Sequence, residues 1–381
     1  MWTTIEQGDK SMKATVSLKD LKKAIDHVSV CVPSRSSIPV LTGLLIEAEN
    51  KETIKILSND MEMGIIAKCQ AQVEESASIV LPGKLLIGIA RGMVGETVTI
   101  NSLSDSMVTE LRCGKSIFKL TGYPPENFPV FPPFQKDKYF TVKSEQLRTG
   151  YNRTAFAASN DETRGPLTGV LIEGKESFLY LAATDGHRLS MHKIEKINDL
   201  VGEKIRFIVP SKVAAAIMRA MVGERVDVIP GQGEIMFDMD TVTVYSRLIE
   251  GEFPEYESVL PTEFTTTVTM NRKTFLEGIE RAALVTTPEE ETIYLQFNNR
   301  KLMMTCESQG MGIAKEEMEI TIEGQAVNIA FNSRFLIDCI RVAPWENISI
   351  GINGEVAPVL IFGDNDEFRH LIMPLKVREE E

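Results

Sequence analysis

A segment of this sequence recurs about 125 residues further along the chain, and this repeat restricts the possible fold more than any other feature. IPVLTGLLIEA at residues 38–48 recurs as RGPLTGVLIEG at residues 164–174. MVGE at residues 93–96 recurs unchanged at residues 221–224. A unit of this length has the size of a domain and is too long for one unit of a solenoid. The chain is therefore predicted to contain similar domains in series.

A third copy is fainter but keeps the same register. FNSR at residues 331–334 follows VPSK at residues 209–212, which in turn follows LPGK at residues 81–84. An alternating apolar pair typical of a strand comes after each of these segments, at Val98 and Ile100, at Val226 and Val228, and at Ile348 and Ile350. We predict three domains at residues 12–132, 138–261 and 262–381, with residues 1–11 as an unmatched N-terminal extension.

Each repeat has the coarse pattern of a helix, several strands, a second helix and further strands. Leu18, Leu21, Ile25 and Val28 have the spacing of one helix face. The strands are short and alternate, as in TVTVYS at residues 241–246. This pattern predicts an α+β fold with antiparallel sheets.

The composition excludes several classes of protein. Hydrophobic residues make up 43% of the 381 residues and charged residues 25%, which is typical of globular chains. No apolar run reaches the ~18 residues of a membrane-spanning helix, and the first residues lack the apolar core of a signal peptide. The five cysteines are scattered, without a CxxC pair or a metal-ligand spacing. We expect a cytoplasmic protein with reduced thiols and with no metal or cofactor.

The charge of the chain is unevenly distributed. The net charge of −13 argues by itself against nucleic acid as a ligand, because phosphates attract cations. The six predicted helical segments nevertheless carry +9 together, so that the remainder carries −22. These segments are residues 18–28, 82–92, 143–157, 211–220, 272–283 and 332–341. Helix propensity alone could produce such an excess. If the helices share one face, however, that face attracts phosphate backbones without reading the base sequence.

The stretch that most resembles a catalytic site is ATDGHRLSMH at residues 183–192. On a strand, Asp185 and His187 would share a face, which leaves open an α+β enzyme built around these two residues. His192 would face the opposite way and could not share a metal with His187. CGKS at residues 113–116 lacks the first glycine of a phosphate-binding loop, because Thr109 stands there. A turn or binding role is favoured for Asp185 and His187.

Several segments, in this order, resemble motifs of the bacterial DNA polymerase III β subunits, the sliding clamp family. They are IPVLTGLLIEA, AFAASNDETRGPLTGVLIE, LAATDGHRL, IVPSK, GEFPEYESVLP and LIMPLK, and the resemblance runs from Met12 to about Val377. It implies three domains of one fold and two chains closed head to tail into a ring, with helices lining the hole and antiparallel sheets outside. It implies a non-catalytic processivity factor that encircles duplex DNA. The implied partners are a clamp loader, the replicative polymerase, repair polymerases and other proteins with a clamp-binding motif.

The resemblance also implies a hydrophobic groove for short peptides between the second and third domains. The matching positions are Leu167, Thr184, Gly186, His187, Arg188, Leu189, Pro254, Val259, Met373, Pro374, Leu375 and Lys376. Lys376 and Ser258 stand where other family members often carry arginine. We expect this to alter peptide affinity, because lysine lacks the planar fork of arginine.

Two further sets of residues complete the expectations. The cations expected to face DNA are Arg35, Lys84, Arg91, Arg148, Arg153, Arg164, Lys212 and Arg219. The implied dimer interface joins Phe118 and Leu120, which alternate on one strand, to Leu284 and Val285 of the second chain. An alternative that also fits the charge pattern is a duplicated nucleic-acid-binding protein that does not close into a ring.

Overall fold

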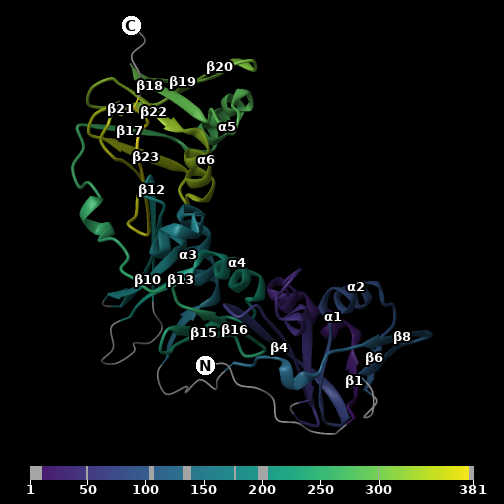
Figure 1. The fold of residues 1–381 in the computed structure, drawn as a ribbon. Coiled ribbons are helices and arrows are strands. Elements are labelled where there is room, and N and C mark those ends of the chain that lie inside the picture. Colours follow the sequence, from purple (N-terminus) through teal and green to yellow (C-terminus); the bar gives the residue numbers. More distant parts are fainter. Residues whose placement is uncertain are drawn as a thin grey trace. The chain divides into compact units, whose positions relative to one another are not determined.

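The computed structural model describes residues 11–48, 50–102, 107–131, 139–175, 177–195, 205–298 and 300–376 (Figure 1). Within these ranges each repeat contains two α-helices of ten or eleven residues, as the sequence predicts. None of the helices in this part of the chain is long and apolar enough to cross a membrane. Residues 1–10 of the predicted extension lie outside the described residues, as do residues 133–137 between the first two predicted domains.

The same order of elements occurs three times. The first repeat contains β1 (Lys13–Ser17), α1 (Leu18–Val28), β2 (Gly43–Ala48), β3 (Thr53–Asn59), β4 (Met63–Glu75), β5 (Ser78–Pro82), α2 (Gly83–Gly92), β6 (Thr97–Ser102), β7 (Val108–Cys113) and β8 (Ser116–Thr121). The second contains β9 (Phe140–Lys143), α3 (Ser144–Thr154), β10 (Gly169–Lys175), β11 (Phe178–Thr184), β12 (Arg188–Glu195), β13 (Arg206–Pro210), α4 (Ser211–Ala220), β14 (Arg225–Pro230), β15 (Glu234–Asp238) and β16 (Val242–Arg247). The third contains β17 (Thr266–Asn271), α5 (Arg272–Ala282), β18 (Thr292–Asn298), β19 (Lys301–Ser308), β20 (Gly312–Glu319), β21 (Thr321–Glu323), β22 (Val327–Asn332), α6 (Ser333–Val342), β23 (Asn347–Ile352), β24 (Val359–Phe362) and β25 (Phe368–Ile372).

Every α-helix begins directly where a strand ends, and polar side chains mark several of these starts. The Ser17 hydroxyl accepts a hydrogen bond from the backbone of Asp20, and Asn271 accepts one from Thr274. Such side chains satisfy amide groups that the first helical turn leaves without a partner. Leu21 and Ile25 of α1 are buried, which confirms the apolar face predicted from their spacing.

Two four-stranded antiparallel sheets make up each repeat. Their strand orders are β5-β2-β3-β4 and β8-β7-β6-β1 in the first repeat, β13-β10-β11-β12 and β16-β15-β14-β9 in the second, and β22-β18-β19-β20 and β25-β24-β23-β17 in the third. β21 adds a short strand beside β17. The predicted α+β class with antiparallel sheets is therefore confirmed.

The sheets continue across both borders between repeats. β16 of the second repeat pairs with β4 of the first, and β25 of the third repeat pairs with β12 of the second. In both cases the last strand of one repeat pairs with the end strand of a four-stranded sheet in the repeat before it, namely β4 of β5-β2-β3-β4 or β12 of β13-β10-β11-β12. For example, Val244 lies opposite Ile65, and Ser190 lies opposite His370.

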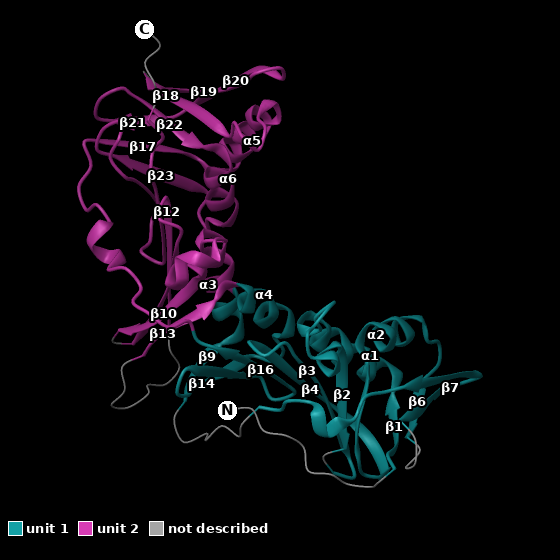
Figure 2. Ribbon diagram, viewed as in Figure 1, with its two compact units in different colours: residues 1–148, 196–202, 212–248 teal, residues 149–195, 203–211, 249–381 magenta. Residues whose placement is uncertain are grey.

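This continuity explains why the three repeats form two compact units (Figure 2). One unit joins the first repeat to the β9, β14, β15 and β16 sheet of the second, and the other joins the β10–β13 sheet to the third repeat. Two of the borders between the units fall inside α3 and α4, and another lies between Leu248 and Ile249, after β16. A large apolar core fills the third repeat, and it includes Phe275, Leu295, Phe331 and Ile340.

Two histidines are buried beside the β12–β25 pairing. His370 is 0% exposed, and neither of its ring nitrogens has a hydrogen-bond partner among the described residues. Burial, and then the charge of Arg188, lower the pKa of His370 to about 3. Burial, and then the charge of Arg153, lower the pKa of His192 to about 4. Both imidazoles are therefore neutral in the folded chain at neutral pH.

We expect the second unit to lose stability as the pH falls below about 6.5. The unfolded histidines gain protons near pH 6.5, whereas the folded ones do so only near pH 3–4. The stability from the neutral rings is therefore complete above the unfolded pKa and decreases towards the folded one, by as much as about 1.4 kcal/mol per pH unit for one histidine. His370→Leu should flatten this slope in urea unfolding between pH 7.5 and 4.5. His187→Asn, which changes an exposed ring, should retain the wild-type slope. Equal slopes in wild type and His370→Leu would show that the buried His370 ring does not cause the loss of stability.

Candidate functional site

The pairing of β12 with β25 creates an apolar cluster to which two repeats contribute. Leu171, Leu189 and Met191 come from the second repeat, Leu360 and Leu371 from the third, and the partly buried Met373 packs against them. The Met373 amide donates to the His187 carbonyl oxygen at 2.8 Å, which extends the strand pairing beyond Ile372. The structure thus brings together three residues of the predicted groove, His187, Leu189 and Met373.

The other predicted groove residues flank this cluster. Pro254 follows Phe253, and Val259 precedes Leu260, and both of these neighbours belong to the cluster or pack against it. The side chains of Val259 and Leu375 are 52% and 39% exposed, so both can be reached from solvent. The Leu375 amide donates to Ala330 O at 2.8 Å and fixes the segment that contains Pro374. Leu167, half-buried, precedes β10, and Thr184 ends β11.

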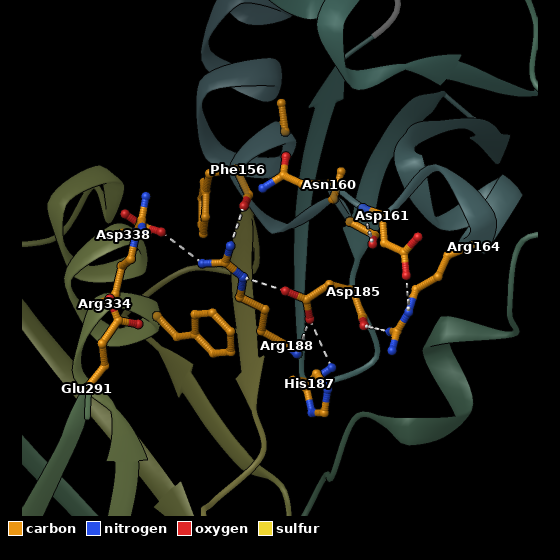
Figure 3. Close-up of a pocket in the computed structure, with 14 residues that line it drawn as sticks. Phe156, Asn160, Asp161, Arg164, Asp185, His187, Arg188, Glu291, Arg334 and Asp338 are labelled. Carbon is orange, nitrogen blue, oxygen red and sulfur yellow. Dashed lines mark hydrogen bonds and ion pairs between the residues drawn. The ribbon is translucent and has the colours of Figure 1, made fainter. Parts of the chain in front are cut away.

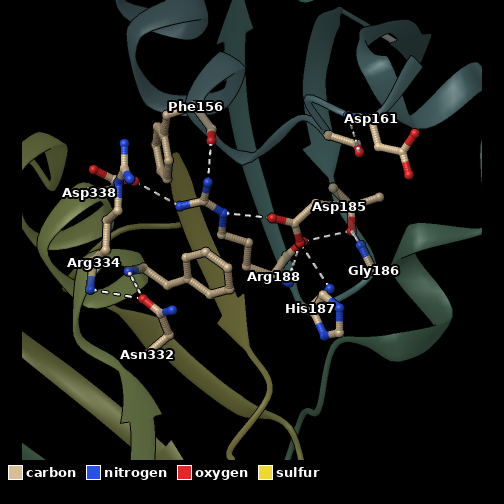
Figure 4. A network of polar contacts seen from close by, with 12 residues as sticks. Phe156, Asp161, Asp185, Gly186, His187, Arg188, Asn332, Arg334 and Asp338 are labelled. Atoms are coloured by element: carbon tan, nitrogen blue, oxygen red, sulfur yellow. Dashed lines mark hydrogen bonds and ion pairs between the residues drawn. The ribbon is translucent and has the colours of Figure 1, made fainter. Parts of the chain in front are cut away.

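Asp185 and His187 lie in the turn between β11 and β12, as the favoured interpretation of the sequence predicts, and they do not share a face of a strand (Figure 4). The Asp185 Oδ1 atom accepts hydrogen bonds from the backbone amides of His187 and Arg188 at 2.9 and 3.0 Å. Gly186 has a φ of 86°, a conformation that favours glycine. Because the Asp185 carboxylate is occupied by the turn and by Arg188, the geometry favours a turn residue over a catalytic acid.

Arg188, predicted as a groove residue, directs its side chain into a buried polar network (Figure 4). Its Nε atom lies 3.0 Å from Asp185 Oδ2, its Nη1 atom donates to Asp338 Oδ2 at 2.9 Å, and its Nη2 atom donates to Phe156 O at 2.6 Å. The guanidinium also lies over the ring of Phe335 at 4.2 Å, with Phe156 at 5.5 Å. This single side chain therefore links β12 of the second repeat to α6 of the third.

A cavity of about 590 Å³ lies around this network (Figure 3). Arg164, Arg188 and Arg334 line it together with Asp161, Asp185 and Asp338. Arg164 donates to the Asp185 carbonyl oxygen, so this arginine supports the same turn. The sequence pointed to Asp338 and Phe335 only as parts of a charged helix, because their contacts with Arg188 span 150 residues of chain. No group of three potential metal ligands occurs among the residues that the structure describes.

Most of the cations predicted to face DNA are exposed, and several have acidic or carbonyl partners within the chain. Arg35, Lys84 and Arg219 are exposed, as are Arg91, Arg148, Arg164 and Lys212. Arg91 lies 3.3 Å from Asp26, Lys212 pairs with Glu62, and Arg148 donates to Met221 O. Arg153 differs, because it is half-buried, with its guanidinium beside His192 and 6.0 Å from the ring of Phe368. It therefore offers less to an external phosphate than the other seven.

The predicted interface residues lie on or near strand edges. Phe118 and Leu120 share one side of β8, but Leu120 is 5% exposed and Phe118 is half-buried. Leu284 is 75% exposed, and Val285 beside it is half-buried. The sequence pattern did not single out Ile117, Met311 and Ile313, which are 49%, 60% and 58% exposed. Their exposure becomes visible only once the edge strands are known.

Comparison with known proteins agrees with this fold. Models of the DNA polymerase III beta subunit match residues 12–132 as its N-terminal domain, 141–255 as its central domain and 257–376 as its C-terminal domain. The beta sliding clamp of Halalkalibacterium halodurans is 30% identical, over 92% of this chain and 96% of that protein.

Solved structures give the same result. The DNA polymerase sliding clamp from Bacillus subtilis superposes with a TM-score of 0.91 at 26% identity, over 96% of this chain and all of that one. A sliding clamp from Pseudomonas aeruginosa bound to griselimycin has a TM-score of 0.89 at 25% identity, with the same coverage. The fold is thus that of a three-domain DNA clamp. The chain belongs to the family of bacterial DNA polymerase III beta subunits, the beta sliding clamps.

Proposed function

We propose that two copies of this chain close head to tail into a ring that encircles duplex DNA and tethers polymerases and other proteins to it. The protein acts in the cytoplasm as a non-catalytic processivity factor, and a clamp loader opens the ring. Each copy supplies three domains, at residues 12–132, 138–261 and 262–381. The family-model matches, which have nearly the same bounds, support this division.

The observation that carries the proposal is the pairing rule at the borders between repeats. The last strand of the second repeat pairs with β4, and the last strand of the third repeat pairs with β12. By the same rule, β8 of the first repeat should pair with β20, which occupies the equivalent place in the third repeat. Both strands are edges within the described chain, and an unpaired edge invites pairing with another chain. Two copies satisfy both edges at once, which is how a closed symmetric dimer forms.

The charges and exposed apolar residues at these two edges support a second copy of the chain as the pairing partner. β8 carries Lys119 and no acid, and Lys115 precedes it, whereas β20 carries Glu316, Glu317 and Glu319 against the single cation Lys315. Exposed apolar residues accompany both edges, with Ile117 on one and Leu284 near the other. Opposite charges across paired strands stabilise the pairing and oppose pairing of like edges.

Leu284→Asp should convert the dimer to monomers without unfolding the chain. The side chain is 75% exposed, so the change places no charge in a core, but it places one in the proposed interface. Light scattering at micromolar concentration should report the mass of one chain. Val356→Asp makes the same kind of change at a residue that is 67% exposed, and this variant should stay dimeric. A wild-type chain that is already monomeric at this concentration excludes the ring.

The apolar cluster around Leu189 and Met373 is the proposed peptide groove. A short segment with the pattern QLxLF would place its leucine and phenylalanine side chains between Val259, Leu375 and the cluster beneath them. Binding through a few apolar anchors is typical of such sites. The griselimycin complex of the Pseudomonas aeruginosa relative supports ligand binding by this family.

Met373→Ala combined with Leu375→Ala should abolish peptide binding and leave the dimer intact. The wild type should bind a labelled QLSLF peptide with a roughly micromolar Kd, as measured by fluorescence anisotropy. Met373 is partly buried and Leu375 is 39% exposed, so their truncation removes peptide anchors and only part of the packing of the cluster. Unchanged peptide affinity in the double variant would exclude this groove.

The proposed DNA contacts are weak and topology provides retention. The six helical segments carry +9 per chain, thus +18 per dimer, spread around a duplex. Such contacts read charge and not sequence, and they weaken with salt. An enzyme or an unclosed DNA-binding protein would not be retained on a circle after its contacts are weakened.

Loaded protein should therefore stay for many minutes on a nicked circular DNA, and a single double-strand cut should release it. A moderate increase in salt should hardly change its retention on the circle, because the contacts do not hold it there. Gel filtration of the protein–DNA complex before and after the cut gives the measurement. Protein that remains bound to the linear product with free ends would show that affinity holds it, and the ring would be excluded.

A further inference from the structure

A second buried polar network, separate from that of Arg188, surrounds Glu173 on β10. The residue is 5% exposed. The Tyr256 hydroxyl donates to its Oε2 atom at 2.9 Å, and Lys175 Nζ lies 2.9 Å from the same oxygen. The Arg206 guanidinium, from the neighbouring strand β13, pairs with Oε1. Glu173 is therefore a buried carboxylate with two cationic partners and one hydroxyl donor.

The partners of this network attach the segment at residues 250–265, here named the connector, to the sheet. Arg206 Nη2 donates to Phe253 O at 3.3 Å and lies 3.6 Å from Glu255. Lys175 Nζ lies 2.8 Å from Glu257 and 5.4 Å from the centre of the Tyr256 ring. Successive connector residues are thus held by β10 and β13, and Glu173 joins the two cations that hold them.

The other hydrogen bonds that join the connector to the described chain lie at its C-terminal end, where Asn353 donates to Glu263 O at 2.7 Å and the Thr265 amide donates to Ile352 O at 3.2 Å. Its one helical turn is the 3₁₀ segment Tyr256–Val259, which lies in the part held by β10 and β13. Phe253 and Tyr256 are buried in the apolar cluster of the proposed groove, whereas Pro254 and Val259 project outward. The positions of Pro254 and Val259 therefore depend on how firmly Phe253 and Tyr256 are held in the cluster.

The charge state of Glu173 strengthens its bonds to the side chains that hold the connector. Burial acts to raise the pKa of the carboxyl, but the hydrogen bonds from Lys175 and Tyr256 and the charges of Lys175 and Arg206 outweigh it and hold the pKa below its usual value. Burial, together with the neighbouring carboxylate, raises the pKa of Tyr256, so its hydroxyl remains a donor. A charged acceptor makes a stronger hydrogen bond than a neutral one.

We propose that Glu173 is a positioning residue for peptide binding, whose carboxylate holds the connector against β10 and β13 so that Pro254 and Val259 form one wall of the groove. The inference rests on the proposed function of the groove and deepens it, because it assigns peptide affinity to a residue that the peptide does not touch. The Glu173 carboxylate keeps this wall formed before the peptide binds, so binding does not have to order the connector.

Glu173→Gln should weaken binding of the QLSLF peptide about tenfold, since it removes a charged acceptor from three bonds. Tyr256→Phe, which removes only the hydroxyl, should weaken binding about threefold, and it serves as the second variant if Glu173→Gln does not fold. Glu255→Gln is the matched control. It makes the same chemical change on the connector, beside the same arginine, but at a side chain that is 85% exposed, so binding should change less than about twofold. All measurements use the dimeric full chain, with the melting temperature recorded for each variant.

A double-mutant cycle with Val259→Ala separates positioning of the wall from general destabilisation. If Glu173 acts through the wall, Glu173→Gln or Tyr256→Phe should add little further loss once Val259 is truncated. Effects that add fully in the double variant, or Glu173 and Tyr256 variants that bind like wild type, overturn the inference while the groove stands. A wild-type dimer that does not bind the peptide refutes the groove itself, and the inference with it.

Discussion

Backbone pairing across the borders between repeats is the constraint on which the rest of the structure depends. If the repeats folded separately, β16 and β25 would be exposed edges, with unpaired amide and carbonyl groups. Their pairing with β4 and β12 removes both edges. It also places Leu189 beside Leu371, and so builds an apolar cluster that neither repeat could bury alone. The candidate groove is therefore a consequence of the same pairing that holds the repeats in series.

The buried Arg188 helps to orient the second and third repeats where β12 pairs with β25. Exchange of a buried ion pair for well-packed apolar residues is often neutral for stability, whereas removal of one partner costs about 3–5 kcal/mol because the other charge stays buried. The pair of Arg188 with Asp338 is thus weak grounds for stability as such. Its three hydrogen bonds, however, form together only when Asp185, Phe156 and Asp338 of α6 are all in place. It fixes the turn that presents the His187 carbonyl oxygen to Met373.

The sequence predicted the features that depend on local periodicity. The repeat of elements, the six helices and the alternating strands follow from spacing that neighbouring residues set, and the bounds of the helices agree closely with the structure. The direction of single side chains did not follow, because it depends on partners far along the chain. Arg153 was counted as a cation for DNA, but the packing of α3 turns it towards His192 and Phe368. The turn at Asp185 and His187 was favoured from the sequence, because it is local, but the contacts of Arg188 beside it were not. The network of Glu173 was missed for the same reason, since Tyr256 lies 83 residues away from it.

Internal ion pairs also affect how the proposed DNA face can work. Arg91 and Lys212, on α2 and α4, already have the acidic partners Asp26 and Glu62 at the surface. An exposed pair contributes only about 0–1 kcal/mol, so a phosphate that takes the place of the acid gains little net free energy. Each contact is therefore nearly balanced by the one it replaces, and the free energy changes little as one phosphate gives way to the next. A protein with such contacts can move along a duplex without a deep minimum at any position, provided that something other than affinity prevents its escape. The free edges of β8 and β20 supply a physical means for that, since their pairing in a dimer would close the chain on itself around the DNA.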